Sequence, residues 1–209
     1  VVSLQPVDGK VLIGGVFTGY NGVPRNNIAR LTTAGALDTT FDPGSGADDE
    51  VAAIAVQPAD GKVLVGGSFG TVNGAKREGI ARLHANGSLD GAFAPTVDGA
   101  VLAIAVQADG KILIGGFFTT VNGATHHRIA RLNPNGTLDP TFGDAAIASQ
   151  NVHVAALAAQ PNGRIVIGGQ FTTVGGVERR YIARLKADGT LDASFDPGSG
   201  ANWTVFAVT

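Results

Sequence analysis

The sequence predicts an all-β fold, a β-propeller of four-stranded antiparallel blades, with four repeats of about 52 residues in this chain. Three observations predict it. A Gly-Gly pair at the end of the second apolar segment, an Ile-Ala-Arg triplet and a Leu-Asp pair each recur in all four repeats, separated by the same steps of 52, 49 and 53 residues. Short apolar segments alternate with turn-forming pairs that end in glycine. No segment shows sustained helical periodicity.

Each repeat reads as four strands, which the second repeat illustrates. Residues 51–57 are apolar and alanine-rich, and residues 62–69 are β-branched and apolar on both faces. Residues 80–84 are shorter and amphipathic, and residues 89–93 form a weak final strand. A strand that is apolar on both faces is expected where neighbouring blades cover both faces of its sheet.

Turn-forming pairs connect these strands in every repeat. In the second repeat they are Asp60-Gly61, Asn73-Gly74 and Asn86-Gly87. An Asx-Gly pair between apolar runs favours a two-residue type I′ hairpin, because both central positions need positive φ. Three hairpins then join four strands into a meander. A β-solenoid is the alternative, but its coils are usually shorter and lack tight hairpins.

The aligned motifs also give the repeat boundaries. The units are approximately 1–50, 51–100, 101–151 and 152–204, and residues 205–209 either start a further unit or complete the first. Val1 and Thr209 align with positions inside equivalent first strands, and the sequence has no methionine. We therefore expect a segment of a longer protein, with blade number and ring closure left open.

Composition excludes several classes of function. The net charge of −2 provides no basic footprint for nucleic acid. The lack of cysteine excludes a disulfide scaffold, a thiolate metal site and a cysteine nucleophile. No apolar run is long enough for a membrane-spanning helix, and no phosphate loop or nucleophile elbow occurs. We expect a non-enzymatic chain with no cofactor, no metal, no nucleic-acid partner and no membrane insertion.

The repeated string can be compared with a known one. It reads V-x-AIAVQ-x-DGKILIGG-x-FT-x-VNG, then IARL, a turn, and LD-x-x-F. This string closely resembles the bacterial delta-sixty repeat, a β-propeller family of unknown function. The resemblance covers the whole chain, with mild departures at Gly175-Gly176 and Ala34-Gly35. It implies a secreted or cell-surface bacterial protein and supplies no catalytic residues.

Strand direction predicts where a ligand would bind. The connections from second to third strand and the loops between blades share one face, where the residues vary among repeats. Loops on a rigid scaffold are where binding residues concentrate. The candidate ligand-binding residues on this variable face are Tyr20, Arg25, Arg77, His126, His127, Arg179, Tyr181 and Trp203. The competing interpretation is that they are solvated loop residues.

The strictly recurring arginines and aspartates are predicted to be structural. A two-residue turn at Asn86-Gly87 would place Arg82 opposite Gly91, so that Arg82 and Asp90 point to opposite sides of their blade. An Arg–Asp pair would then bridge neighbouring blades and set their registry. The residues of this predicted inter-blade set are Arg30, Arg82, Arg131, Arg184, Asp38, Asp90, Asp139 and Asp192.

These expectations define one leading function and two alternatives. The leading function is a structural and binding scaffold in a larger bacterial secreted or cell-surface protein, with a protein or glycan partner on the variable face. The first alternative is a building block of an extracellular filament, in which copies self-associate through strands or blades into a larger ring or fibre. The second is a lectin-like, glycan-binding propeller.

Overall fold

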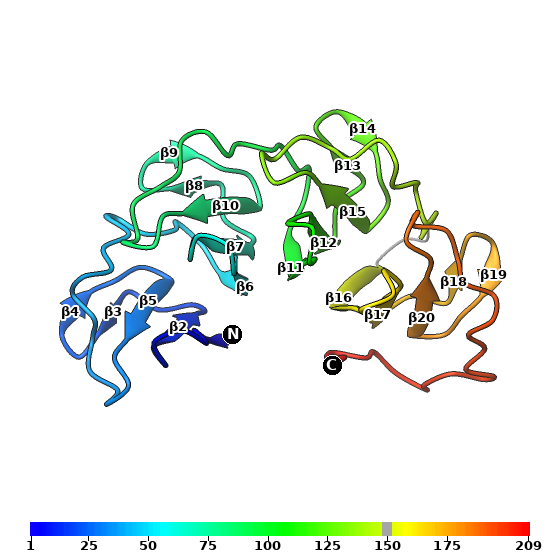
Figure 1. The fold of residues 1–209 in the computed structure, drawn as a ribbon, viewed down its shortest axis with the longest axis horizontal. Helices are drawn as coiled ribbons and strands as arrows, with labels where there is room; N and C mark the ends of the chain where they lie inside the picture. The colour runs from blue at the N-terminus through cyan, green and yellow to red at the C-terminus, as the bar shows by residue number, and fades with distance from the viewer. Residues whose placement is uncertain (148–151) are drawn as a thin grey trace. The chain divides into compact units, whose positions relative to one another are not determined.

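The computed structural model describes residues 1–147 and 152–209, and these form β-strands without any helix (Figure 1). In this part of the chain no helix is long and apolar enough to cross a membrane. The chain divides into two compact units, Val1–Thr96 and Val97–Thr209. Each unit holds two of the predicted repeats, and each repeat forms one blade.

Every blade is built around a three-stranded antiparallel sheet with the second strand in the middle. The strands of unit 1 are β1 (Val2–Leu4), β2 (Val11–Gly14) and β5 (Ile28–Leu31) in the first blade, and β6 (Val51–Val56), β7 (Val63–Gly67) and β10 (Ile80–Leu83) in the second. The strands of unit 2 are β11 (Val101–Val106), β12 (Ile112–Gly116) and β15 (Ile129–Leu132), then β16 (His153–Ala159), β17 (Ile165–Gln170) and β20 (Ile182–Leu185).

The connection from the second to the third strand is longer than a simple hairpin. It carries its own two-stranded ribbon in each blade. The ribbons are β3–β4 (Gly19–Tyr20 and Val23–Pro24), β8–β9 (Thr71–Val72 and Ala75–Lys76), β13–β14 (Thr120–Val121 and Ala124–Thr125) and β18–β19 (Thr173–Val174 and Val177–Glu178). Asn21 and Gly22 at the tip of the first ribbon have φ of 48° and 77°. The predicted type I′ turn is therefore confirmed at the ribbon tips.

The fourth strand of each blade is very short. It consists of one isolated bridge to the third strand, such as Leu83 with Leu89. Backbone hydrogen bonds flank that bridge, from His84 N to Ser88 O and from Asp90 N to Arg82 O, both 2.8 Å long. The four-stranded antiparallel meander is thus present, with its last strand reduced to a few residues.

The predicted two-residue turn at Asn86-Gly87 is wrong. Only Gly87 has positive φ, and three residues lie between His84 and Ser88, whose backbones are bonded. A glycine with positive φ after two ordinary residues is typical of the three-residue hairpin loop. The extra residue shifts the strand register by one. Because side chains alternate between faces, Arg82 now lies opposite Asp90 rather than Gly91.

Glycines of the second strand allow the two blades of one unit to approach closely. A Cβ atom at Gly14 would lie 2.6 Å from Cγ1 of Val51 in the next blade, and one at Gly115 would lie 2.7 Å from Cγ1 of Val154. Any side chain there would collide with the neighbouring blade. The cores include large phenylalanines, such as Phe69 in unit 1 and Phe171 in unit 2.

Candidate functional site

Four of the predicted ligand-binding residues occupy one equivalent position, just after the ribbon. Three are arginines whose guanidinium Nη1 donates to the carbonyl of the preceding residue, at 2.9 Å for Arg25, 2.7 Å for Arg77 and 2.8 Å for Arg179. The fourth is His126, which is only 6% exposed. Burial lowers the pKa of His126, which favours its neutral form. These side chains are folded onto their own blades rather than extended from them.

Two residues after that position, every blade adopts left-handed backbone geometry. Asn27, Gly79, Arg128 and Tyr181 have φ of 63°, 72°, 69° and 67°. Asparagine and glycine adopt this conformation readily, whereas arginine and tyrosine do so at a cost. The amide of Tyr181 donates a 2.8 Å hydrogen bond to Phe171 O. The repeat therefore constrains the backbone of Tyr181, a predicted ligand-binding residue.

The remaining predicted binding residues belong to three different blades. The Tyr20 hydroxyl donates a 2.8 Å hydrogen bond to Gly35 O in its own blade. Nδ1 of His127 lies 2.6 Å from Oδ2 of Asp144, and the His127 amide donates to Oδ1 of the same carboxylate. Trp203 is 72% exposed. Among the described residues, no group of three or more His, Cys, Asp or Glu could hold a metal ion.

The recurring arginine and aspartate form an ion pair inside each blade, which corrects the prediction that they join neighbouring blades. The Nε–Oδ2 distance is 2.8 Å for Arg30–Asp38, 2.9 Å for Arg82–Asp90, 2.7 Å for Arg131–Asp139 and 2.8 Å for Arg184–Asp192. The prediction failed because it assumed the two-residue turn. The longer loop turns both side chains to the same side.

Other side chains complete this charged cluster in each blade. In the first blade the Lys10 ammonium lies 2.9 Å from Oδ2 of Asp38, and the Thr40 hydroxyl donates to Oδ1. The Arg30 guanidinium lies over the Phe41 ring, 4.9 Å from its centroid. In the other three blades the role of Lys10, a second cation beside the aspartate, is taken by Lys62, Lys111 and Arg164.

The donors around these aspartates keep them ionised. Burial raises the pKa of Asp38, but hydrogen bonds, first among them those of Thr40 and Lys10, hold it well below its usual range. Burial likewise opposes the shift at Asp90, where Lys62 and Arg82 lower the pKa to about 2.

Two of the same arginines do link the two blades of a unit, because each donates a hydrogen bond to a main-chain carbonyl of the next blade. Nη1 of Arg30 donates a 2.8 Å hydrogen bond to Ala85 O in the second blade. In unit 2, Nη1 of Arg131 donates at 2.7 Å to Ala187 O. Registry between the blades of a unit is therefore set by a guanidinium and a main-chain carbonyl of the next blade.

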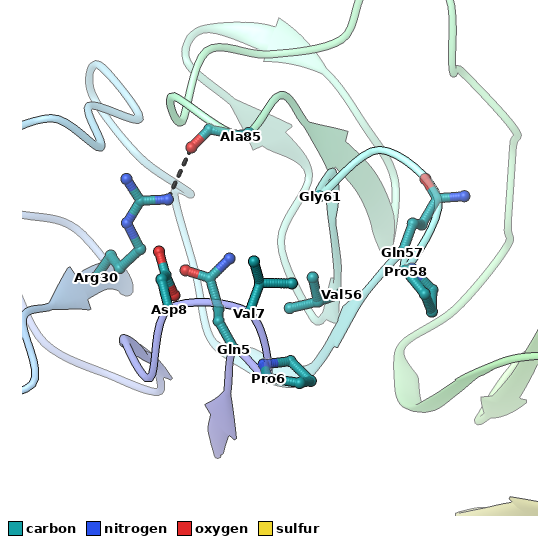
Figure 2. Close-up of a pocket in the computed structure, with 10 residues that line it drawn as sticks. All are labelled: Gln5, Pro6, Val7, Asp8, Arg30, Val56, Gln57, Pro58, Gly61 and Ala85. Atoms are coloured by element: carbon teal, nitrogen blue, oxygen red, sulfur yellow. Dashed lines mark hydrogen bonds between the residues drawn. The ribbon is translucent and has the colours of Figure 1, made fainter.

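A cavity of about 390 Å³ lies beside the Arg30–Ala85 bond, between the first hairpins of the two blades of unit 1 (Figure 2). It is on the face opposite the predicted variable face. Its walls are mostly apolar, and its polar groups come from two glutamines, one aspartate, one arginine and main chain. The lining residues are Gln5, Pro6, Val7, Asp8, Arg30, Val56, Gln57, Pro58, Gly61 and Ala85.

One polar atom of this pocket is buried without a partner. Gln5 is 7% exposed, and its Oε1 accepts no hydrogen bond. In contrast, Oε1 of Gln57 lies 3.5 Å from Nη1 of Arg82. Sequence reasoning missed these glutamines, although a signal existed. Glutamine recurs at the end of the first strand, at positions 5, 57, 107 and 160.

A second pocket repeats the arrangement in unit 2. Its volume is about 430 Å³, and it lies between the first hairpins of the third and fourth blades. Oε1 of Gln107 and Oε1 of Gln160 are buried there without a partner. The lining residues are Val106, Gln107, Ala108, Asp109, Ala159, Gln160, Pro161 and Gly163.

Comparison with known proteins decides the family. The model of the domain of unknown function (DUF5122) beta-propeller matches residues 8–41, 59–93, 107–142 and 160–195. The chain belongs to this family. Each of the four matches falls within one blade and begins after its first strand, and together they cover more than half of the chain. No curated protein matches the sequence.

A solved structure is similar to this DUF5122 β-propeller in fold. It is the crystal structure of a protein of unknown function from Bacteroides caccae, with a TM-score of 0.50 and 14% identity. The alignment covers 91% of this chain and 64% of that one, so the present chain spans less than two thirds of that protein's length. At this identity the similarity concerns the fold alone.

Proposed function

We propose that this DUF5122 β-propeller is a non-enzymatic assembly and binding scaffold, in which one copy docks on another through the edges of their blades. The observation that carries the proposal is the apolar face of β1, because the equivalent face of β6 packs on the preceding blade. Val2 is 69% exposed and Leu4 is 64% exposed. Apolar side chains that stand side by side on a strand typically mark an interaction surface.

The second blade supplies the comparison. Ile54 and Val56 on β6 hold the positions of Val2 and Leu4, and both pack against the core of unit 1. Ile54 reaches across to the first blade, where its Cδ1 lies 3.0 Å from where a Cβ of Gly14 would be. A blade of this repeat therefore uses this face to contact the blade before it.

A second copy of the chain offers the matching surface. Ile54 packs over Gly14 in the first blade. The equivalent glycine in the fourth blade is Gly168. The three atoms nearest to a Cβ at Gly168 all belong to Val205, which occupies the place of Val51. Val2 of a second copy would take over Gly168 the place that Ile54 takes over Gly14, and β1 would have to displace Val208, which aligns with Ile54 in the same chain. Such a head-to-tail contact is heterologous, so it closes into a ring or continues as a fibre.

Two further features support a scaffold rather than an enzyme. The recurring charged side chains of all four blades are engaged in structural ion pairs. The resemblance of the repeat to the delta-sixty repeat favours a bacterial secreted or cell-surface protein. Protease treatment of intact cells that produce the natural protein tests this location, because a surface protein is cleaved and an internal one is protected.

Light scattering coupled to size-exclusion chromatography tests the association. We expect the apparent mass to rise above the 21.1 kDa of one chain as concentration increases. Leu4→Asp should keep the chain at one-copy mass, because a carboxylate on β1 would be buried without a partner. Val16→Asp is the matched control, since Val16 is exposed but lies outside β1. One-copy mass for the unaltered chain at all concentrations would overturn the proposal, and electron microscopy distinguishes rings from fibres.

A further inference from the structure

Three of the four histidines of the chain lie at one junction of unit 2, between the third and fourth blades. His126 and His127 directly follow the ribbon of the third blade, and His153 begins β16 of the fourth. His126 and His153 are 6% and 8% exposed, and Nδ1 of each is buried without a partner among the described residues. Phe117 covers the His153 ring, with 4.4 Å between the ring centroids. Both sites therefore suit a neutral imidazole.

The positive groups near these two rings oppose a proton on either. Arg128 repels a charge on His153, and a charge on His127 repels one on His126. Burial is the larger cause, and together with these charges it lowers the pKa of both His126 and His153 below the ordinary 6.5, although Asp144 opposes the shift at His126. A further proton at the junction is thus disfavoured while the junction stays closed.

The negative groups of the junction are already engaged. Asp144 accepts hydrogen bonds from two backbone amides, and its Oδ2 lies 2.6 Å from Nδ1 of His127. Asp98, beside the same ribbon, accepts hydrogen bonds from the amides of residues 119–120. The sequence places no ionisable side chain in residues 148–151. Two additional protons would therefore find little free negative charge.

The same junction fastens the third blade to the fourth. The loop that joins the blades is bonded to the third blade through Asp144 and His127. It is bonded to the fourth blade through the carbonyl of Ala145, which accepts a 2.9 Å hydrogen bond from the amide of Gly175 at the tip of the fourth ribbon. Ala145 is buried in the core of unit 2. Charging the histidines beside this loop would weaken its hold on the fourth blade.

Unit 1 has the same junction without a histidine. The three places are taken there by Arg25, Asn26 and Glu50. The equivalent link to the next ribbon is present, because the amide of Asn73 donates a 2.8 Å hydrogen bond to the carbonyl of Gly46. Arginine and asparagine keep their charge state between about pH 5 and pH 7, and glutamate is mostly ionised there. Unit 1 is therefore an internal control for unit 2.

We propose that the junction of unit 2 is an acid-sensitive switch, closed at neutral pH and opened when His126 and His153 take up protons. The open state gives both rings access to water, so it binds more protons than the closed state. A lowered pKa in the closed state means that stability is complete above the open-state value and is lost as pH falls below about 6.5. The switch lies within one chain and does not depend on association between copies.

Hydrogen exchange of the full chain, followed by nuclear magnetic resonance, tests the switch. The amides of Gly175 and Asn73 are matched reporters, because each bonds to the inter-blade loop of its own unit. Protection factors remove the intrinsic pH dependence of exchange. Between about pH 7 and pH 5 the protection of Gly175 should fall about tenfold or more, and that of Asn73 should change much less. Equal changes at both amides, or no loss at Gly175, would overturn the proposal.

Variants assign the response to the two buried histidines. The double variant His126→Gln, His153→Ala removes both titrating groups, and alanine is the residue that the third blade has at the place of His153. Its Gly175 amide should keep its protection at about pH 5. His84→Asn is the matched control, because His84 lies in the last hairpin of the second blade and asparagine holds its place in the third. This control should retain the full acid response, and a response that persists in the double variant contradicts the assignment.

A measurement on the unaltered chain covers the case in which the double variant does not fold. The side-chain resonances of His126 and His153 report the pKa of each ring directly. Values below 6.5 support the switch, since the closed state must disfavour the proton. Values at or above 6.5 would overturn it, because protonation could not then open the junction.

Discussion

Nε of Arg131 donates a 2.7 Å hydrogen bond to Oδ2 of Asp139, eight residues further along the chain. The bond joins the third strand of a blade to the start of its short fourth strand. Lys111 and Thr141 donate to the same carboxylate, and the Asp139 side chain is buried. One ion pair thus holds the part of the blade that has the fewest backbone bonds.

Removing this carboxylate should destabilise unit 2. Asp139→Ala leaves the Arg131 guanidinium buried beside no anion, which typically costs about 3–5 kcal/mol. We expect a clearly lower midpoint of thermal unfolding, followed by circular dichroism. Asp60→Ala is the comparison, since Asp60 is exposed and contacts only the Lys62 amide and ammonium beside its own turn. Similar midpoints for the two variants would show that the pair contributes little.

Acid should weaken the fold over a defined pH range. The folded-state pKa of Asp90 and of Asp192 is lowered to about 2, from an unfolded value near 4. A depressed pKa gives stability that is complete above the unfolded pKa and is lost as pH falls through the folded one. The contribution of these two aspartates to the unfolding midpoint should therefore be complete above about pH 5 and be lost as pH falls below about pH 4. A midpoint that stays constant down to about pH 2 contradicts this origin.

A single methyl group should disturb the contact between blades. Gly115→Ala would place its Cβ 2.7 Å from Cγ1 of Val154. Overpacking of this kind costs about 1–3 kcal/mol. The free energy of unfolding from urea titration measures the loss. The double variant with Val154→Ala should recover part of the lost free energy of unfolding, because the smaller side chain leaves room for the added Cβ. Gly91→Ala is the control, because nothing lies within 4 Å of the added Cβ.

The left-handed position of the fourth blade offers a stabilising change. Tyr181 has φ of 67°, and the equivalent residue in the first blade is Asn27. Asparagine tolerates this conformation better than tyrosine. Tyr181→Asn should raise the free energy of unfolding by about 0.5–1 kcal/mol. A urea titration that shows a loss instead would mean that packing of the Tyr181 ring outweighs the backbone strain.

Much of the fold could be predicted from the sequence, because its signals are local and repeated four times. The order of strands, the four repeats and the type I′ turns at the ribbon tips all follow from glycine spacing and apolar segments. The register of the last hairpin could not be predicted reliably. An Asn-Gly pair such as Asn86-Gly87 fits both a two-residue and a three-residue loop, and the choice depends on what the flanking side chains bond to.

The candidate site was harder to predict for a different reason. Sequence variation predicted binding at the loops around Arg25 and His126, but those side chains are folded onto their own blades. The pockets are lined instead by glutamines such as Gln5 and Gln107, which recur in every repeat and so resemble structural residues. A cavity arises from the space between two blades, and no pattern within one repeat reports it.

The bond from Arg30 to Ala85 uses a main-chain oxygen, which every residue possesses. This hydrogen bond between the two blades of unit 1 thus makes no demand on the side chain of Ala85, only on the path of its backbone. Whole repeats can then be gained, lost or exchanged by recombination without breaking this bond. Such tolerance lets the two blades of a unit change their loop residues while the bond between them stays intact.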